Sequence, residues 1–212
     1  MATRTLLVVT AGLSEPSSTR LLADRLSAAA AGALHGAGSE PQVEVLELRD
    51  YAQDLTNNLL TGFPSPRLRA AIQRVISADG LICVSPIFNA SYSGLFKLFW
   101  DVLERDSLAG KPVSIAATGG TARHSLALEH ALRPLFSYLN GAVMPTAVYA
   151  ATEDWGSSAA PVDGDLVDRI QRAGAELAAA ISGSPPRTPV DPLDEPTPFE
   201  EMLHSVRSGG DA

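Results

Sequence analysis

The fold is decided by one stretch near the start of the chain, residues 5–26, which reads TLLVVTAGLSEPSSTRLLADRL. It opens with a continuous apolar run, Leu6–Val9, that has the length of a strand buried on both faces. Leu22, Leu26 and Ala29 then fall on one face of a helix. A strand, a loop and a helix in this order are the first part of a unit in which a helical crossover joins two parallel strands.

The same alternation continues through most of the chain. Further apolar runs of strand length lie at Val43–Leu48, Leu81–Val84, Val113–Ala117 and Val143–Val148. Helical stretches are expected at Leu68–Ile76, Ser91–Glu104, Ser125–Leu139 and Gly164–Ile181. Because apolar strands joined by long crossovers are typical of parallel sheets, the pattern predicts an α/β fold, a three-layer α/β/α sandwich with a parallel five-stranded sheet. For that number of strands the flavodoxin-like order 2-1-3-4-5 is expected.

Composition narrows the possible classes of protein. The chain has 212 residues and a formal net charge of −8, which opposes binding to nucleic acid. No apolar run approaches the roughly 20 residues that span a membrane, and no export signal is expected. The single cysteine, Cys83, excludes an intramolecular disulfide and a cysteine-based zinc site, and it fits a cytoplasmic protein.

The chain changes character at Gly183. Residues 1–182 are expected to form one flavodoxin-like domain, and residues 183–212 a proline-rich tail. The end of the tail, PFEEMLHSV, places apolar residues at helical spacing and predicts a short amphipathic helix, with a disordered terminus as the alternative. The apolar residues of this helix are Phe199, Met202, Leu203 and Val206.

Hydroxyl side chains crowd the predicted start of the first helix. Ser14, Ser17, Ser18 and Thr19 follow the first strand, with Arg20 beside them. A helix start presents unpaired N–H groups and a positive dipole end, so this loop predicts a pocket for a terminal phosphate, such as that of FMN. Ordinary capping is the alternative. The loop has neither G-x-G-x-x-G nor G-x-x-x-x-G-K-[ST], which argues against a dinucleotide fingerprint and a P-loop.

The loop after the third predicted strand is suited to a planar ring. Pro86 is expected to end that strand. Ile87, Phe88, Asn89 and Ala90 then combine aromatic and small side chains that can lie against an isoalloxazine.

A glycine turn follows the fourth predicted strand. At Thr118, Gly119 and Gly120 a ligand can approach the backbone closely, and free N–H groups can donate to flavin carbonyl oxygens. A glycine turn without a ligand is the alternative. All three loops should lie at the carboxyl ends of strands near the topological switch point, where open α/β sheets bind ligands.

These loops carry a resemblance to a known family. The segment PIFNASYSG fits the pattern P-x-[FY]-x-x-[SA]-Y-S-G and is followed by ATGGT. This combination resembles the NAD(P)H-dependent FMN reductases that serve two-component flavin monooxygenases, most closely the alkanesulfonate type. The opening GLSEPSSTRLLADRL and the late PFEEML are similar to a subgroup associated with luciferase-like monooxygenases.

The resemblance implies that residues 1–182 bind FMN and transfer hydride to it from NAD(P)H. The hydroxyl loop would hold the FMN phosphate, residues 86–90 would contact the ring and ribityl chain, and Gly119 and Gly120 would border the isoalloxazine. Many relatives have G-S-x-R in the phosphate loop, where this chain has GLSE at residues 12–15. The arginine must therefore come from Arg20 or be dispensed with.

A further role follows from the same resemblance. In alkanesulfonate-type relatives a tyrosine at the place of Tyr92 lies in a π-helical turn near the flavin, at a tetramer interface. This implies that role for Tyr92, with an ordinary helix-start residue as the alternative, and it implies a homodimer or homotetramer. From their place after the glycine turn, Arg123 and His124 are candidates to steer the phosphates of the nicotinamide nucleotide, with a surface histidine at a helix start as the alternative. No catalytic acid or base is nominated, because the two cofactors carry the hydride chemistry.

The expected function is therefore reduction of FMN for a partner flavin-dependent monooxygenase. Two alternatives remain open from the residues alone. One is a quinone or azo reductase in which FMN stays bound, and the other is a flavodoxin-like electron carrier without nicotinamide activity.

Overall fold

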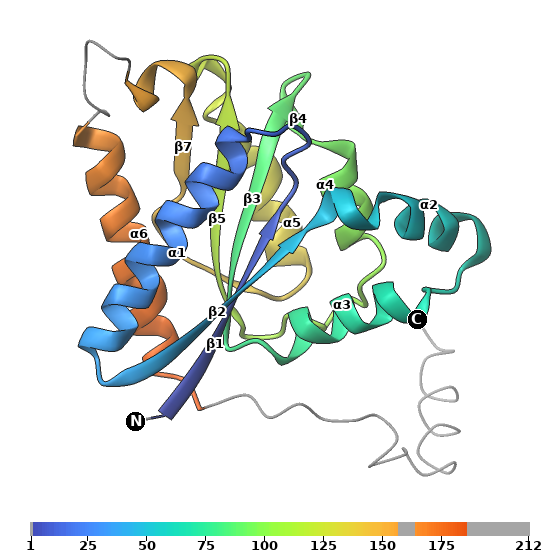
Figure 1. The fold of residues 1–212 in the computed structure, drawn as a ribbon, viewed down its shortest axis with the longest axis horizontal. Helices are drawn as coiled ribbons and strands as arrows, with labels where there is room; N and C mark the ends of the chain where they lie inside the picture. Colours follow the sequence, from blue (N-terminus) through green and yellow to red (C-terminus); the bar gives the residue numbers. More distant parts are fainter. Residues whose placement is uncertain (1, 157–163, 186–212) are drawn as a thin grey trace, which may run out of the picture.

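A mostly parallel sheet runs through the centre of the molecule, with helices on both of its faces (Figure 1). The computed structural model describes residues 2–156 and 164–185. The strands are β1 (Ala2–Thr10), β2 (Ser39–Glu47), β3 (Gly80–Phe88), β4 (Ser91–Tyr92), β5 (Pro112–Gly119), β6 (Ala142–Val143) and β7 (Val148–Ala151). Their order is β2-β1-β3-β5, and β6 and β7 both pair with the remaining edge of β5. The predicted flavodoxin-like fold and order are confirmed, because β6 and β7 together occupy the fifth position.

The sheet has seven strands, not the predicted five. One extra strand is β4, a short antiparallel partner of the end of β3. The other arises because the predicted strand Val143–Val148 is interrupted by side chains of neighbouring helices. Arg133 donates to the carbonyl of Pro145 at 3.1 Å, and Glu176 accepts from the Thr146 N–H at 2.8 Å. The backbone between β6 and β7 therefore has partners outside the sheet.

Helices cover both faces of the sheet, with one group on each face. They are α1 (Ser18–Gly36), α2 (Ala52–Thr61), α3 (Pro66–Ser77), α4 (Gly94–Trp100), α5 (Arg133–Tyr138) and α6 (Gly164–Ser182). Shorter turns are η1 (Leu48–Tyr51), η2 (Ala122–His124), the π-helical η3 (Leu128–Leu132) and η4 (Thr152–Trp155). Leu6 and Val8 of β1 pack with α1 and α6, whereas Leu7 and Val9 pack in the core formed with α2 to α5. The continuous apolar run in β1 is thus explained by burial on both faces.

Two of the predicted helices are shorter than expected. In the stretch Ser91–Glu104, the first two residues form β4, and α4 begins only after Ser93. The Ser93 hydroxyl accepts from the Phe96 N–H at 3.2 Å, which is an N-cap contact. The stretch Ser125–Leu139 is divided between η3 and α5. The sequence pattern did not predict α2.

The described part of the chain ends shortly after α6. Arg4 of β1 donates to the carbonyl of Ser184 at 2.7 Å. The predicted amphipathic helix within residues 199–206 lies outside the described residues, and the boundary at residue 182 stays a prediction. None of the helices described is both long and apolar enough to cross a membrane.

Candidate functional site

A cleft of about 400 Å³ opens at the carboxyl ends of β1, β3 and β5. Its volume is within the range of small-ligand sites, and it adjoins the switch point between β1 and β3. The lining consists of Leu13, Ser14, Ser17, Ser18, Thr19, Pro86, Ile87, Phe88, Thr118, Gly119, Gly120 and Thr152. The three loops predicted from the sequence therefore converge on one cleft.

The start of α1 forms one end of the cleft. Ser17 is the N-cap residue, and its hydroxyl accepts from the Arg20 N–H at 3.2 Å. The amides of Ser18 and Thr19 have no acceptor within the helix, because they belong to its first turn. A side chain on Gly12 would overlap with the Ser17 hydroxyl, which would have to move and give up its capping bond to the Arg20 N–H. This end of the cleft offers backbone donors and hydroxyls to an anion.

A buried hydrogen bond joins this end to the sheet. The hydroxyls of Thr19 and Thr118 are 2.8 Å apart. Both residues are nearly fully buried, so the helix start and the end of β5 are held in a fixed relation. Thr10, the last residue of β1, has a buried hydroxyl without a partner in the described part of the chain. The Thr10 hydroxyl at the end of β1 is therefore a polar group whose hydrogen bonds the described residues do not satisfy.

The glycine turn after β5 is held by Tyr149 of β7. The Tyr149 hydroxyl donates to the carbonyl of Thr121 at 2.9 Å. A Cβ on Gly119 would overlap with that hydroxyl, whereas a Cβ on Gly120 would meet no atom within 4 Å. Burial, with a further contribution from the negative charge of Asp154, raises the pKa of Tyr149, so the phenol remains a neutral donor. Gly119 is required by packing, and Gly120 borders open space.

The loop expected after β3 is a tight hairpin. Pro86 does not end the strand, which continues to Phe88. The carbonyl of Val84 accepts from Ala11 at 3.0 Å, and two residues further on the nitrogen of Pro86 faces the same side, beyond the end of β1. No ladder hydrogen bond is lost there, which explains why the strand tolerates a proline.

Two of the residues predicted in this loop lie outside the cleft lining. Asn89 and Ala90 form the tip of the hairpin between β3 and β4, with φ values of 43° and 70°. Positive φ at both central positions is typical of a two-residue hairpin turn. The hairpin thus presents Ile87 and Phe88 to the cleft and directs its tip elsewhere.

Arg20, expected as the phosphate-binding cation, does not line the cleft. Its guanidinium bonds Asp24 at 2.7 Å and also contacts Glu47 at the end of β2. Arg49 likewise pairs with Glu47, at 2.9 Å, and with Glu15. Carboxylates therefore neutralise both arginines, and the lining found for the cleft contains no ionisable side chain.

Tyr92 lies in the strand β4, so the expectation of a π-helical turn at this residue is wrong. Pairing with Ile87 holds its backbone in extended form. The π-helical turn occurs instead at η3, around His130. Tyr92 and His130 both line a second hollow, of about 590 Å³, which shares no residue with the cleft.

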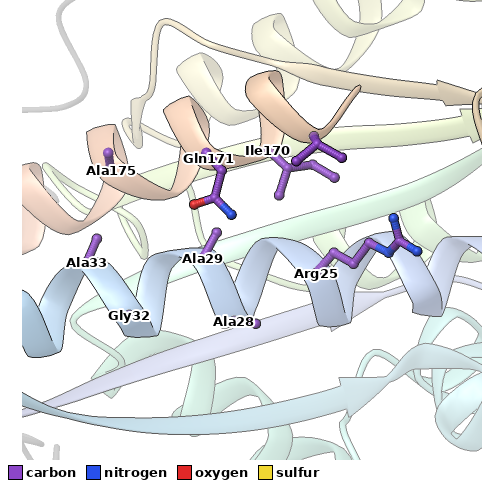
Figure 2. A pocket seen from close by; sticks show the side chains of 9 residues that line it. Arg25, Ala28, Ala29, Gly32, Ala33, Ile170, Gln171 and Ala175 are labelled. Atoms are coloured by element: carbon purple, nitrogen blue, oxygen red, sulfur yellow. The ribbon is translucent and has the colours of Figure 1, made fainter. Parts of the chain in front are cut away.

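A third hollow, of about 500 Å³, lies between α1 and α6 (Figure 2). Ala29, Gly32 and Ala33 form much of one wall, and Gln171 and Ala175 part of the other. It lies in the helix layer, away from the strand ends. Small apolar side chains dominate it, so it lacks the convergent polar groups of the cleft.

Two lining residues were not predicted from the sequence. Leu13, in the loop after β1, is half-exposed and supplies an apolar wall. Thr152 follows the end of β7 and adds a hydroxyl. Thr152 could have been found as the first residue after the fifth strand, but that strand was predicted to end at Val148 and not at Ala151.

Comparison with known proteins is consistent with this arrangement. Residues 4–156 match the family model described as NADPH-dependent FMN reductase. The chain is 37% identical to the FMN reductase (NADPH) of Pseudomonas aeruginosa, covering 82% of this chain and 90% of that protein. It is 35% identical to the NADH-dependent FMN reductase SfnF of Pseudomonas fluorescens, covering 82% and 89% respectively.

A solved structure agrees over most of the chain. An oxidoreductase from Corynebacterium diphtheriae superposes with a TM-score of 0.83 at 44% sequence identity, covering 87% of this chain and all of that one. Together these matches favour flavin reduction over the alternatives of a quinone or azo reductase and an electron carrier. The chain belongs to the NADPH-dependent FMN reductase family, and it is an oxidoreductase that uses NAD(P)H and FMN.

Proposed function

We propose that FMN binds reversibly in the cleft at the ends of β1, β3 and β5, and that the reduced flavin leaves for a separate flavin-dependent monooxygenase. The observation that carries this proposal is that no residue of the cleft lining, within the part of the chain that the structure describes, is charged. A dianionic phosphate would be held there by amides, hydroxyls and the dipole of α1, without a cation in contact. Such a site favours exchange of the flavin over permanent retention.

The residues present fit the parts of FMN. Ser17, Ser18 and the first amides of α1 would receive the phosphate. The Ser17 hydroxyl accepts from the Arg20 N–H and keeps its own proton to donate, whereas the Ser14 hydroxyl already donates to the carbonyl of Pro16. Ile87 and Phe88 would contact the ring, and the N–H groups near Gly119 and Gly120 would donate to its carbonyl oxygens. Asn89 and Ala90, originally expected as contacts, are not part of this assignment.

When bound, FMN supplies a flavin that accepts hydride from the nicotinamide. The part played by this chain is to hold the ring, exclude water from one of its faces and leave the other accessible. Phe88, 48% exposed, and Leu13, 53% exposed, present apolar surface at the mouth of the cleft. A ring that stacks there would cover them.

The decisive experiment is steady-state oxidation of NADPH and NADH with increasing FMN. We expect turnover of many equivalents of free FMN and a protein that loses its flavin on gel filtration. A protein that keeps FMN through gel filtration and reduces a quinone without added flavin would contradict reversible binding. Reduced flavin supply is tested by activity of a two-component monooxygenase separated from the reductase by a dialysis membrane.

We also propose a homodimer or homotetramer in the cytoplasm. The support is the resemblance to multimeric reductases and the exposed apolar side chains of Leu59, Leu60 and Phe63 at the end of α2, which a second subunit could cover. Light scattering during gel filtration distinguishes a monomer, which would contradict the proposal, from either assembly.

A further inference from the structure

The turn that borders the cleft continues directly into an arginine and a histidine. Gly119 and Gly120 line the cleft, and the 3-10 turn η2 begins two residues later with Ala122. Arg123 and His124 are the next residues, and both are exposed. η2 packs against β7, whose following residue also lines the cleft. Arg123 and His124 therefore lie at the rim of the cleft.

The position of this rim is well defined. The carbonyl of Thr121 accepts the hydrogen bond from Tyr149, and the side chain of Thr118 is bonded to Thr19. Both ends of the glycine turn are thus tied to the sheet or to α1. A charge placed on η2 has a fixed relation to whatever binds in the cleft.

Arg123 differs from the other arginines near the site. Arg20 and Arg49 are each held by carboxylates. Arg123 has no ion pair or hydrogen bond from its guanidinium to any residue that the structure describes. In a protein of net charge −8, an arginine without an acidic partner beside a cleft is available to an anionic ligand.

We propose that Arg123, with His124 beside it, binds the 2′-phosphate of the adenosine ribose of NADPH and makes NADPH the preferred reductant. This inference rests on the proposed function, because the nicotinamide must reach a flavin in the cleft. NADPH and NADH differ only in this phosphate, so discrimination requires a charge outside the uncharged lining. The relatives named above include both an NADPH-dependent and an NADH-dependent reductase.

The test compares Arg123→Ala and Arg123→Lys with a matched control, Arg172→Ala. Arg172 is an exposed arginine on α6 that does not line the cleft. We measure kcat/KM for NADPH and NADH at saturating FMN. The wild type should prefer NADPH by roughly ten-fold, the value of one charge-assisted contact. Arg123→Ala should lose most of this preference through a higher KM for NADPH, with NADH kinetics unchanged. Arg123→Lys should keep part of it, and the control all of it.

A second readout does not depend on turnover. Inhibition or calorimetric binding by 2′,5′-ADP should weaken roughly ten-fold in Arg123→Ala, whereas 5′-AMP should bind wild type and variant equally. Equal loss for both nucleotides, or an unchanged NADPH preference in Arg123→Ala, would overturn the assignment. If no FMN is reduced with either nucleotide, the proposed function fails, but the 2′,5′-ADP comparison still decides the role of Arg123.

Discussion

Thr19 and Thr118 share a buried hydrogen bond of 2.8 Å between their hydroxyls, although one residue lies in the first turn of α1 and the other near the end of β5. Along the chain, β2, β3 and the helices α2 to α4 lie between α1 and β5, and in the sheet β3 separates β1 from β5. The bond therefore links the end of the cleft at α1 to its glycine turn. It lies at the edge of the sheet where the three loops meet.

Replacing Thr118 with Val should both destabilise the protein and weaken FMN binding. The change keeps the shape of the side chain but leaves the buried Thr19 hydroxyl without a partner, at a cost of about 1–3 kcal/mol. Thermal unfolding should shift downward by several degrees, and the Kd for FMN should rise several-fold. Thr118→Ser keeps the hydroxyl and serves as the control. A Val variant that matches the wild type in FMN titration would show that the bond does not position the site.

Gly119→Ala should disrupt the glycine turn through Tyr149. The new Cβ overlaps with the Tyr149 hydroxyl and lies 3.1 Å from the ring carbon that carries it, so the tyrosine must move and give up its bond to Thr121. We expect a loss of about 1–3 kcal/mol in unfolding free energy and a clear rise in the FMN Kd. Gly120→Ala, where the added carbon meets open space, should leave stability unchanged.

The same argument predicts partial rescue. Combining Gly119→Ala with Tyr149→Phe removes the overlapping oxygen, so the double variant should be less destabilised than the sum of the two single changes. Chemical denaturation of all four proteins measures this coupling. Strict additivity would indicate that the two residues do not act through the contact.

The strands and their order could be predicted because apolar burial on both faces leaves a direct trace in the sequence. The division of the fifth strand was not predicted, since it depends on side chains of two helices that flank this segment in the chain, Arg133 of α5 and Glu176 of α6. The partner Asp24, four residues after Arg20 on the same helix, was visible in the sequence, but the second partner, Glu47, is brought close only by the pairing of β2 with β1. The local sequence pattern identified the loops that form the cleft. It did not show which side chains in these loops are already paired with other residues of the protein.

Ser18→Asp should separate binding of the phosphate from binding of the ring. The Ser18 side chain lines the cleft at the first turn of α1, so a carboxylate there would repel a phosphate from the same donors. We expect the KM for FMN to rise about ten-fold or more at low salt, with a smaller effect at high salt. The variant should reduce riboflavin, which lacks the phosphate, as efficiently as the wild type does. Ser18→Ala is the control. An equal loss with both flavins would place the phosphate elsewhere.

Cys83 should be unreactive in the folded protein and should make it sensitive to alkali. It lies fully buried within β3, and burial raises the pKa of its thiol well above the ordinary value. A disulfide reagent should therefore label it only after denaturation. The unfolded thiol ionises above about pH 8.5, whereas the folded one stays protonated, so the stability present below that pH is lost as pH rises. Cys83→Ala removes the contribution of the thiol to the pH dependence of stability. The unfolding free energy of this variant should therefore change less with pH between about pH 8.5 and 10. Denaturation curves across this range, compared at matched ionic strength, check the difference in slope; parallel curves for wild type and variant would contradict it.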